Sequence, residues 1–192
     1  MTYIPKILAF AGSTRTDSYN KKLIRIAVAG AKAAGADVTL IDLRDFPMPL
    51  YDGDLETREG LPANAVKLKE LFLKNQGLLI SSPEYNSSIP GVLKNAVDWV
   101  SRGDEKPLAC FEGKTAALMS ASPGALGGLR ALVPLRLMFS NIRVMVMPDQ
   151  ISVPKAHEAF DADGRLKDAK QQAAVEKLGA ALAILLARLN GT

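Results

Sequence analysis

Two short polar segments carry the side chains in this chain that are best suited to chemistry. The first, Gly12-Ser13-Thr14-Arg15-Thr16-Asp17-Ser18-Tyr19-Asn20, follows the apolar run 7–11 and precedes apolar residues at helical spacing. A helix start presents unpaired N–H groups and partial positive charge, so hydroxyls and a guanidinium there suit a phosphate monoester dianion. The segment lacks both Gly-Lys-Ser/Thr and Gly-x-Gly-x-x-Gly. We therefore predict a mononucleotide phosphate site, with an ordinary capped turn as the alternative.

The second segment is Pro83-Glu84-Tyr85-Asn86-Ser87-Ser88-Ile89-Pro90-Gly91, which follows the apolar run 78–82. Pro90 suits the first position of a helix, and the apolar residues of 93–100 recur at helical spacing. A carboxylate, a phenol and a carboxamide at the end of a strand can hydrogen-bond and flank a planar heterocycle. Two such loops on neighbouring parallel strands form one crevice, and together they predict a flavin site.

Both segments resemble the NAD(P)H-dependent FMN reductase family, which includes quinone, azo-dye and chromate reductases. The matching patterns are Gly12-Ser13-x-Arg15-x-x-Ser18-x-Asn20 and Pro83-Glu84-Tyr85-Asn86-x-Ser88-x-Pro90-Gly91-x-Leu93-Lys94-Asn95-Ala96-x-Asp98-Trp99. A third match, Ser120-Ala121-Ser122-Pro123-Gly124-Ala125-Leu126-Gly127-Gly128-x-Arg130, follows another apolar strand. The resemblance spans nearly the whole chain, and its second pattern is the most specific.

The resemblance implies an oxidoreductase with bound FMN and NADPH or NADH as co-substrate. Chemistry then takes place at flavin N5, by a ping-pong two-electron route, without a metal or a catalytic side chain of the protein. Phosphate and ribityl contacts are expected from the first loop, and contacts to the ring edge from 83–86, mostly through backbone groups. The expected cofactor-binding residues are Ser13, Arg15, Ser18, Tyr19, Asn20, Pro83, Glu84, Tyr85, Asn86, Ser120 and Gly124.

Strand and helix patterns alternate along the chain, which predicts an α/β fold with a parallel sheet covered on both faces. The expected strands are 7–11, 38–43, 78–82, 115–120 and 144–147, and helices are expected before 34, over 63–74 and 90–100, from about 128, and at the end. The resemblance implies a flavodoxin-like three-layer, doubly wound sandwich with strand order 2-1-3-4-5. We expect one FMN-binding domain over residues 1–192.

Composition agrees with these expectations. Of 192 residues 48% are hydrophobic, enough for a sizeable core, and no run approaches a membrane span. The run 7–11 is too short for the apolar region of a signal peptide, and the single cysteine excludes an internal disulfide, so we expect a cytoplasmic protein. The net charge is +4 and the pI about 9.2. We expect anionic small-molecule substrates, no nucleic-acid or membrane partner, and a homodimer or homotetramer.

Two other function classes remain open: a flavodoxin-type single-electron carrier that binds protein partners, and a flavin-free scaffold with a decayed site. Basic charge and the Pro-Glu-Tyr-Asn loop favour the enzyme over the carrier, and three intact loops disfavour the scaffold. The physiological acceptor, whether quinone, free flavin, azo compound or oxyanion, is not set by these motifs. The choice between NADH and NADPH is equally open.

Several other features have plain interpretations. Asp161-x-Asp163-Gly164 lacks the later ligands of a calcium loop and is expected to be a turn. Nothing pairs His157 with Cys110 as nucleophile and base. Connection 46–62 is expected either to be a mobile rim of the site or a surface loop, and Pro134 to kink its helix or delay its start. We expect Trp99 either in the core or at a subunit interface. If the protein is a homodimer, we expect it at the interface.

Overall fold

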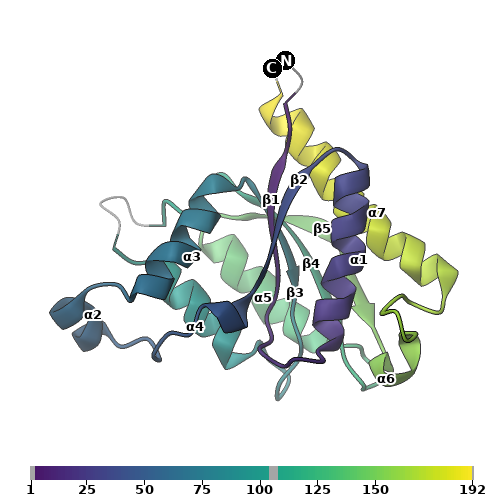
Figure 1. The fold of residues 1–192 in the computed structure, drawn as a ribbon, viewed down its shortest axis with the longest axis horizontal. Helices are drawn as coiled ribbons and strands as arrows, with labels where there is room; N and C mark the ends of the chain where they lie inside the picture. The colour runs from purple at the N-terminus through teal and green to yellow at the C-terminus, as the bar shows by residue number, and fades with distance from the viewer. Residues whose placement is uncertain (1–2, 104–107, 192) are drawn as a thin grey trace.

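Five parallel strands form the centre of the molecule. The computed structural model describes residues 3–103 and 108–191. The strands are β1 (Lys6–Ala11), β2 (Asp37–Asp42), β3 (Gly77–Ser81), β4 (Thr115–Ala121) and β5 (Met145–Val153). They lie in the order β2-β1-β3-β4-β5 (Figure 1), which confirms the predicted flavodoxin-like sheet.

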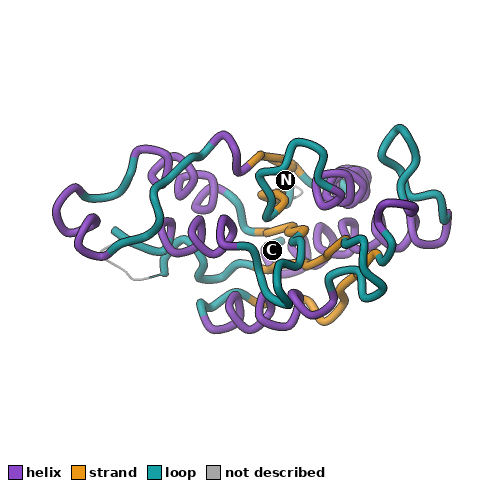
Figure 2. The backbone as a smooth tube through the Cα atoms, turned by 90° about the horizontal axis from the view of Figure 1, so that it is seen from below, coloured by secondary structure: helices purple, strands orange, loops and turns teal. Residues whose placement is uncertain are grey.

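Helices cover both faces of this sheet, so that the strands lie between helices when the molecule is viewed from below (Figure 2). One face packs against α1 (Tyr19–Ala33) and α7 (Ala169–Asn190). The opposite face packs against α3 (Ala63–Lys74), α4 (Gly91–Val100) and α5 (Leu129–Asn141). Three short helices complete the chain: η1 (Leu43–Asp45), α2 (Gly53–Glu59) and α6 (Ala156–Ala159).

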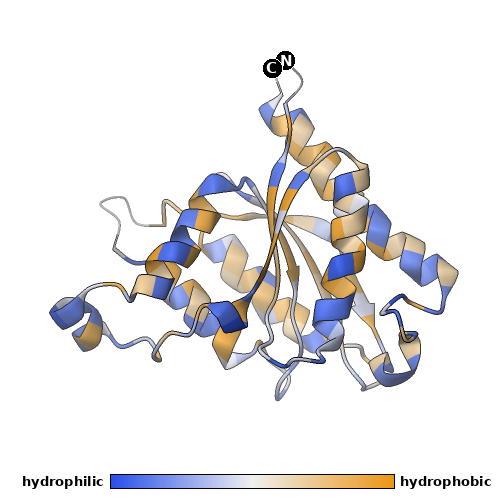
Figure 3. Ribbon diagram, viewed as in Figure 1, coloured by the Kyte–Doolittle hydropathy of each residue, from blue (hydrophilic) through white to orange (hydrophobic). Residues whose placement is uncertain are grey.

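Alternation of side chains along the strands divides the core into two clusters. In β1, Ile7 and Ala9 belong to the cluster under α1 and α7, whereas Leu8 and Phe10 belong to the other. All four are buried because helices cover both faces, which is why the strand reads as a continuous apolar run. Figure 3 shows the apolar sides of the helices turned toward the sheet.

Two glycines hold α1 close to α7. A Cβ on Gly30 would lie 1.9 Å from the Glu176 carbonyl oxygen, and one on Gly179 would lie 1.9 Å from the Ala27 carbonyl oxygen. Only glycine allows such an approach of two backbones. The contact matters for the site because it fixes the helix whose first turn borders the first polar loop.

Two boundaries differ from the sequence prediction. Strand β5 continues from Met145 to Val153, beyond the predicted end at 147, and its pairing with β4 shifts register between Ala116 and Leu118. Helix α5 starts at Leu129, so the predicted late start at Pro134 is wrong. Leu132 and Leu135 on either side of this proline are fully buried, and their burial offsets the backbone hydrogen bond that proline removes.

The connection 46–62 is more ordered than either interpretation of it assumed. It contains α2, which has no buried residue and projects from the body (Figure 1). Before α2 the chain is pinned to α4, because Asn95 Nδ2 and Trp99 Nε1 both donate to the Pro49 carbonyl, at 2.9 and 2.8 Å. Asn95 Oδ1 also accepts from the Tyr51 N–H at 2.8 Å.

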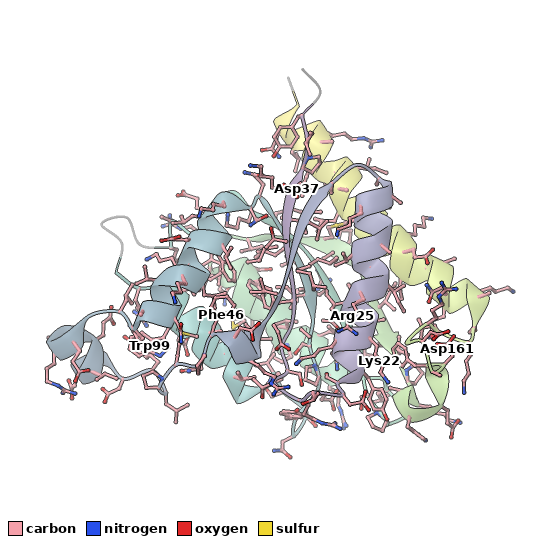
Figure 4. All side chains as sticks on the ribbon, in the orientation of Figure 1. Lys22, Arg25, Asp37, Phe46, Trp99 and Asp161 are labelled. Carbon is pink, nitrogen blue, oxygen red and sulfur yellow. The ribbon has the colours of Figure 1, made fainter. Side chains whose placement is uncertain are left out.

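Trp99 lies inside this pinned region and is fully buried. Its ring meets Tyr51 edge to face at 5.1 Å between centroids, and Figure 4 shows it between α4 and this connection. The tryptophan therefore belongs to the interior of its own chain, as the core interpretation held. Its expected place at a subunit interface is wrong, because the 46–51 segment covers it.

None of the helices in the described ranges is long and apolar enough to span a membrane.

Lys114 gives the fold a testable pH dependence. It is buried at the start of β4, donates to the Asn75 carbonyl, and burial lowers its pKa. The unfolded chain then binds more protons than the folded one between the lowered pKa and about 10.4, so stability due to this group rises with pH in that window. We expect wild type to gain stability relative to Lys114→Met as the pH is raised from about 7 to about 10. Urea unfolding at several pH values measures this, and a difference independent of pH would contradict it.

Candidate functional site

The carboxyl ends of β1, β3 and β4 meet at one edge of the sheet, at the bottom of Figure 1. The three loops that leave them enclose a small hollow of about 60 Å³. Eight of the predicted site residues border it, and Asn86, Ser120 and Gly124 do not. Its lining consists of Ser13, Arg15, Ser18, Tyr19, Asn20, Pro83, Glu84, Tyr85, Ala121, Ser122 and Pro123.

The first loop brings hydroxyls to the start of α1. Ser18 is the N-cap residue, but its side chain makes no capping hydrogen bond, and the first turn carries no acidic residue. Its carbonyl accepts from the N–H groups of Lys21 and Lys22, while those of Tyr19 and Asn20 find no protein acceptor within the described residues. The start of α1 is thus open to an external anion.

Arg15 adds a positive charge beside this helix start. Its side chain is exposed and makes no ion pair in the part of the chain that the structure describes. The nearby Lys21 ammonium is different, because it lies 2.5 Å from Asp42 Oδ2. Burial raises the pKa of Asp42, but the hydrogen bonds from Lys21 and the Arg44 N–H outweigh burial and hold that pKa below its usual value. Arg15 is therefore the cation of this loop that remains available to a phosphate.

Asn20 is buried, and its side-chain amide makes three hydrogen bonds to the protein. Its Oδ1 accepts from Ser81 Oγ at 2.8 Å and from the Ala121 N–H at 2.9 Å, while Nδ2 donates to the Ala121 carbonyl at 2.9 Å. Strand β3 ends at Ser81, so the amide takes the place that the next residue of β3 would have beside β4. The structure therefore shows Asn20 as a link between α1 and β4, and its predicted contact with the cofactor stays a prediction, since the residue also borders the hollow.

The second loop forms a tight hairpin. Tyr85 and Ser88 exchange two backbone hydrogen bonds, at 3.0 and 3.1 Å. Between them Asn86 and Ser87 have φ of 51° and 63°, a conformation that residues other than glycine rarely adopt. Such backbone strain is concentrated at functional sites. The hairpin turns Asn86 away from the hollow and leaves Tyr85, 46% exposed, at its rim.

The third loop is shaped by Ser120 and two glycines. Ser120 is buried, and its hydroxyl donates to the Gly127 carbonyl at 2.7 Å. Gly127 and Gly128 have φ of 61° and 87°, and a Cβ on Gly128 would lie 2.9 Å from Ser120. The groups that face the hollow are those of 121–123. Sequence reasoning found this motif but missed these three positions, because it could not tell which residues after β4 turn inward.

Tyr19 combines two surroundings. One side of its ring stacks on Phe160 at 6.0 Å between centroids, with Lys22 Nζ 5.8 Å from the ring centre, while the residue also borders the hollow.

Cys110 and His157 lie apart: Cys110 is buried in the cluster under α3, α4 and α5, whereas His157 is on α6 and pairs with Glu158. Among the described residues no group of histidine, cysteine, aspartate and glutamate could hold a metal ion.

The donor set fits FMN. Ser13 and Ser18 are almost fully buried, and neither hydroxyl donates a hydrogen bond to another described residue. With the open start of α1 and Arg15 they supply the N–H, O–H and guanidinium donors that a phosphate dianion needs. A hollow of about 60 Å³ has room for the phosphate end but is far smaller than a pocket that encloses a whole ligand. The hollow itself is therefore too small to enclose a flavin ring.

Larger hollows elsewhere lack this donor set. One of about 660 Å³ runs between α1 and the segment 161–176, past Lys22, Arg25 and Asp161 (Figure 4). Another of about 360 Å³ lies beside β2 and is lined by both charged and apolar side chains. The second adjoins the ends of β1 and β2, but neither is lined by a residue of the three polar loops that follow β1, β3 and β4.

Comparison with known proteins gives one consistent family. Residues 5–158 match the family described as NADPH-dependent FMN reductase. A NAD(P)H-dependent FMN reductase of Pseudomonas aeruginosa is 37% identical over 188 residues, 97% of each chain, and a quinone reductase of Escherichia coli is 38% identical over 146 residues, 75% of each. The structure of FerB, a flavoenzyme NAD(P)H:(acceptor) oxidoreductase from Paracoccus denitrificans, superposes with a TM-score of 0.80, at 28% identity, over 96% of this chain and 98% of its own.

The Asn20 link predicts a large loss of stability in a variant of similar size. Asn20→Leu removes three hydrogen bonds and leaves the Ser81 hydroxyl and both backbone groups of Ala121 without their partner. Because a buried polar group without a partner costs about 1–3 kcal/mol, we expect the free energy of unfolding to fall by at least about 3 kcal/mol. Urea unfolding without added ligand measures this.

Asn64 provides the control, since it is only half-buried and its side chain donates one hydrogen bond, to the Pro47 carbonyl. Asn64→Leu is expected to change the unfolding free energy by no more than about 0.5 kcal/mol. Equal losses in the two variants would mean that Asn20 has no special role.

Proposed function

Because the chain belongs to the NADPH-dependent FMN reductase family, we propose that it passes hydride from NADPH or NADH through bound FMN to a small acceptor, by a ping-pong two-electron route. The protein is an FMN-dependent oxidoreductase with NAD(P)H as co-substrate. The observation that carries the proposal is the small hollow at the open start of α1, which has room for a phosphate but not for a flavin ring. We infer that the ring lies at the rim. A ring at the rim is reachable by donor and acceptor in turn.

The flavin, when bound, supplies the hydride chemistry itself. The chain's residues then have three tasks: to bind the phosphate, to fix the ring and to leave one ring face open. We propose that Ser13, Arg15, Ser18 and the N–H groups of Tyr19 and Asn20 hold the phosphate and ribityl end. The ring edge would lie against Pro83–Tyr85 and 121–123, with Asn86, Ser120 and Gly124 shaping those loops from behind.

Small acceptors suit an open rim. Curated relatives include quinone reductases, and two solved structures with the same fold are titled as azoreductases. We propose a quinone, a flavin, an azo compound or an oxyanion as acceptor. The net charge of +4 supports an anionic co-substrate.

We also propose that residues 1–192 form one FMN-binding domain and that the protein is a homo-oligomer. The single continuous sheet supports the first proposal. An apolar stripe on α5 supports the second: Leu129, Val133 and Leu137 follow one another at four-residue spacing and are 41%, 66% and 61% exposed. A second copy could cover this stripe with its own α5 in a symmetric contact.

Anaerobic reduction tests the proposed activity directly. On mixing with NADH or NADPH, the holoprotein is expected to lose its flavin absorbance within seconds and to regain it on addition of a quinone after the nucleotide has been consumed. A flavin that stays oxidised would favour a single-electron carrier.

We expect the purified protein to release FMN and not FAD on denaturation, because the start of α1 has room for one phosphate. Chromatography of the released flavin measures this. FAD as the main species would contradict the proposed site.

Arg15→Ala is expected to weaken FMN binding by about 1.5–3 kcal/mol, the range for hydrogen bonds to charged groups, without loss of the fold. Fluorescence titration of apoprotein with FMN measures the dissociation constant. If flavin affinity is unchanged and KM for the nucleotide rises, Arg15 meets the co-substrate and not the cofactor.

Light scattering at micromolar concentration is expected to give at least twice the chain mass of 20.5 kDa. Val133→Glu places a charge in the α5 stripe and should reduce the mass to that of one chain. Val66→Glu, at a similarly exposed valine on α3, is the control and should leave the mass unchanged. A monomeric wild type would refute the oligomer.

A further inference from the structure

The carboxylate of Glu84 spans from the second loop to the start of α5. Its Oε2 accepts from the Arg130 N–H at 3.0 Å and from the Ala131 N–H at 3.3 Å, and its Oε1 accepts from Arg130 Nε at 2.9 Å. A glutamate of one loop thus caps a helix that begins after another loop. Negative charge at a helix start is favourable, and bonds to charged groups are stronger than neutral ones.

Burial strengthens this contact. The Glu84 side chain is 9% exposed, whereas that of Arg130 is 60% exposed. Glu84 also borders the small hollow, together with its neighbours Pro83 and Tyr85. Glu84 therefore borders the proposed flavin site, while its carboxylate is bound at the start of α5.

Few other polar contacts hold this loop. The hairpin bonds between Tyr85 and Ser88 are internal to it, and the ladder with β4 ends at the Ser82 N–H, which donates to the Met119 carbonyl. Within the described residues, every hydrogen bond that joins 84–88 to another part of the protein ends on Glu84. Removing this side chain would leave a strained turn without a polar attachment to the third loop and α5.

We propose that Glu84 is a positioning residue for the flavin ring. Its carboxylate fixes the second loop to the start of α5, so that the loops against the two sides of the ring edge form one rigid unit. The inference rests on the proposed location of FMN at this edge of the sheet. It separates two functions within the site: the first loop binds the phosphate, and Glu84 holds the loop that receives the ring.

FMN and riboflavin distinguish these functions, since riboflavin has the ring and ribityl chain but no phosphate. Dissociation constants for both are measured by fluorescence titration of the apoprotein. Glu84→Ala should raise both constants by a similar factor of roughly ten, because the ring site loosens while the phosphate site stays intact. Arg15→Ala should raise the constant for FMN alone.

Asp168→Ala is the matched control for a lost helix cap. Asp168 accepts from the N–H groups of Lys170 and Gln171 at the start of α7 and does not border the hollow. We expect this variant to unfold at a lower temperature and to keep both dissociation constants. If Glu84 had only a structural role, Glu84→Ala would behave like Asp168→Ala, with a lower unfolding temperature and unchanged dissociation constants. The positioning role therefore requires that Glu84→Ala weakens ligand binding and Asp168→Ala does not.

Two further variants keep the test decisive if Glu84→Ala folds poorly. Glu84→Gln retains an acceptor for the backbone N–H groups and should recover part of the affinity for both ligands. Arg130→Met should weaken both ligands less than Glu84→Ala does, and should have no added effect in the Glu84→Ala background. Hydrogen exchange of the apoproteins should show faster exchange at Tyr85 and Ser88 in Glu84→Ala.

The outcomes separate the inference from the proposed function. Unchanged constants for both ligands in Glu84→Ala, or a loss confined to FMN, would overturn the positioning role while the reductase function stands. An independent effect of Arg130→Met in the double variant would show that Arg130 acts on the ligand directly and would also overturn it. If wild type binds neither flavin, the proposed function itself fails.

Discussion

The site depends on how the backbone N–H and C=O groups at the end of the parallel sheet find hydrogen-bond partners. Strand β3 turns away after Ser81 to form the second loop, which leaves the N–H and C=O of Ala121 on β4 without a strand partner. A buried peptide group without a hydrogen bond is costly, and the Asn20 amide supplies both missing bonds from the first turn of α1. The same contact draws the start of α1 against β4 and so places the helix N–H groups beside the third loop. One side chain thus fills the gap between two strands and links it to the anion site.

Side chains that hydrogen-bond to other parts of the protein hold the three loops in place. Asn20 connects the first loop to the ends of β3 and β4. In the third loop the Ser120 hydroxyl bonds to the Gly127 carbonyl, and Glu84 joins the second loop to α5. Several donors find no acceptor among the described residues: the Ser13 and Ser18 hydroxyls, the Arg15 guanidinium and the first N–H groups of α1. These donors are suited to a phosphate. This division fits an enzyme whose cofactor performs the reaction, because the protein then needs a rigid cradle more than an acid or a base.

Apolar runs and loop motifs are local signals, so the alternation of strands and helices and the three loops could be predicted from the residues. The strand order was predicted from the resemblance to a known family. The sequence could not predict which polar side chains turn inward. Asn20 and Ser120 stand in motifs that suggest ligand contact, yet their partners are backbone groups about 100 residues away or across a loop, a relation fixed only by tertiary packing. Trp99 was equally ambiguous, since the segment that covers it, 46–51, carries no helix or strand pattern. Pro134 shows the reverse, where burial of the flanking leucines overrides a local helix-breaking signal.

Phosphorus NMR of the bound flavin tests the central claim most directly, because it reports on the phosphate in the wild-type holoprotein. A phosphate monoester dianion in water takes up a proton and becomes the monoanion near pH 6. If the phosphate lies at the open start of α1 among hydroxyls and Arg15, its dianion is favoured and the resonance should stay unchanged from about pH 8 down to about pH 5. A resonance that titrates near pH 6, as in free FMN, would place the phosphate in solvent and contradict the account.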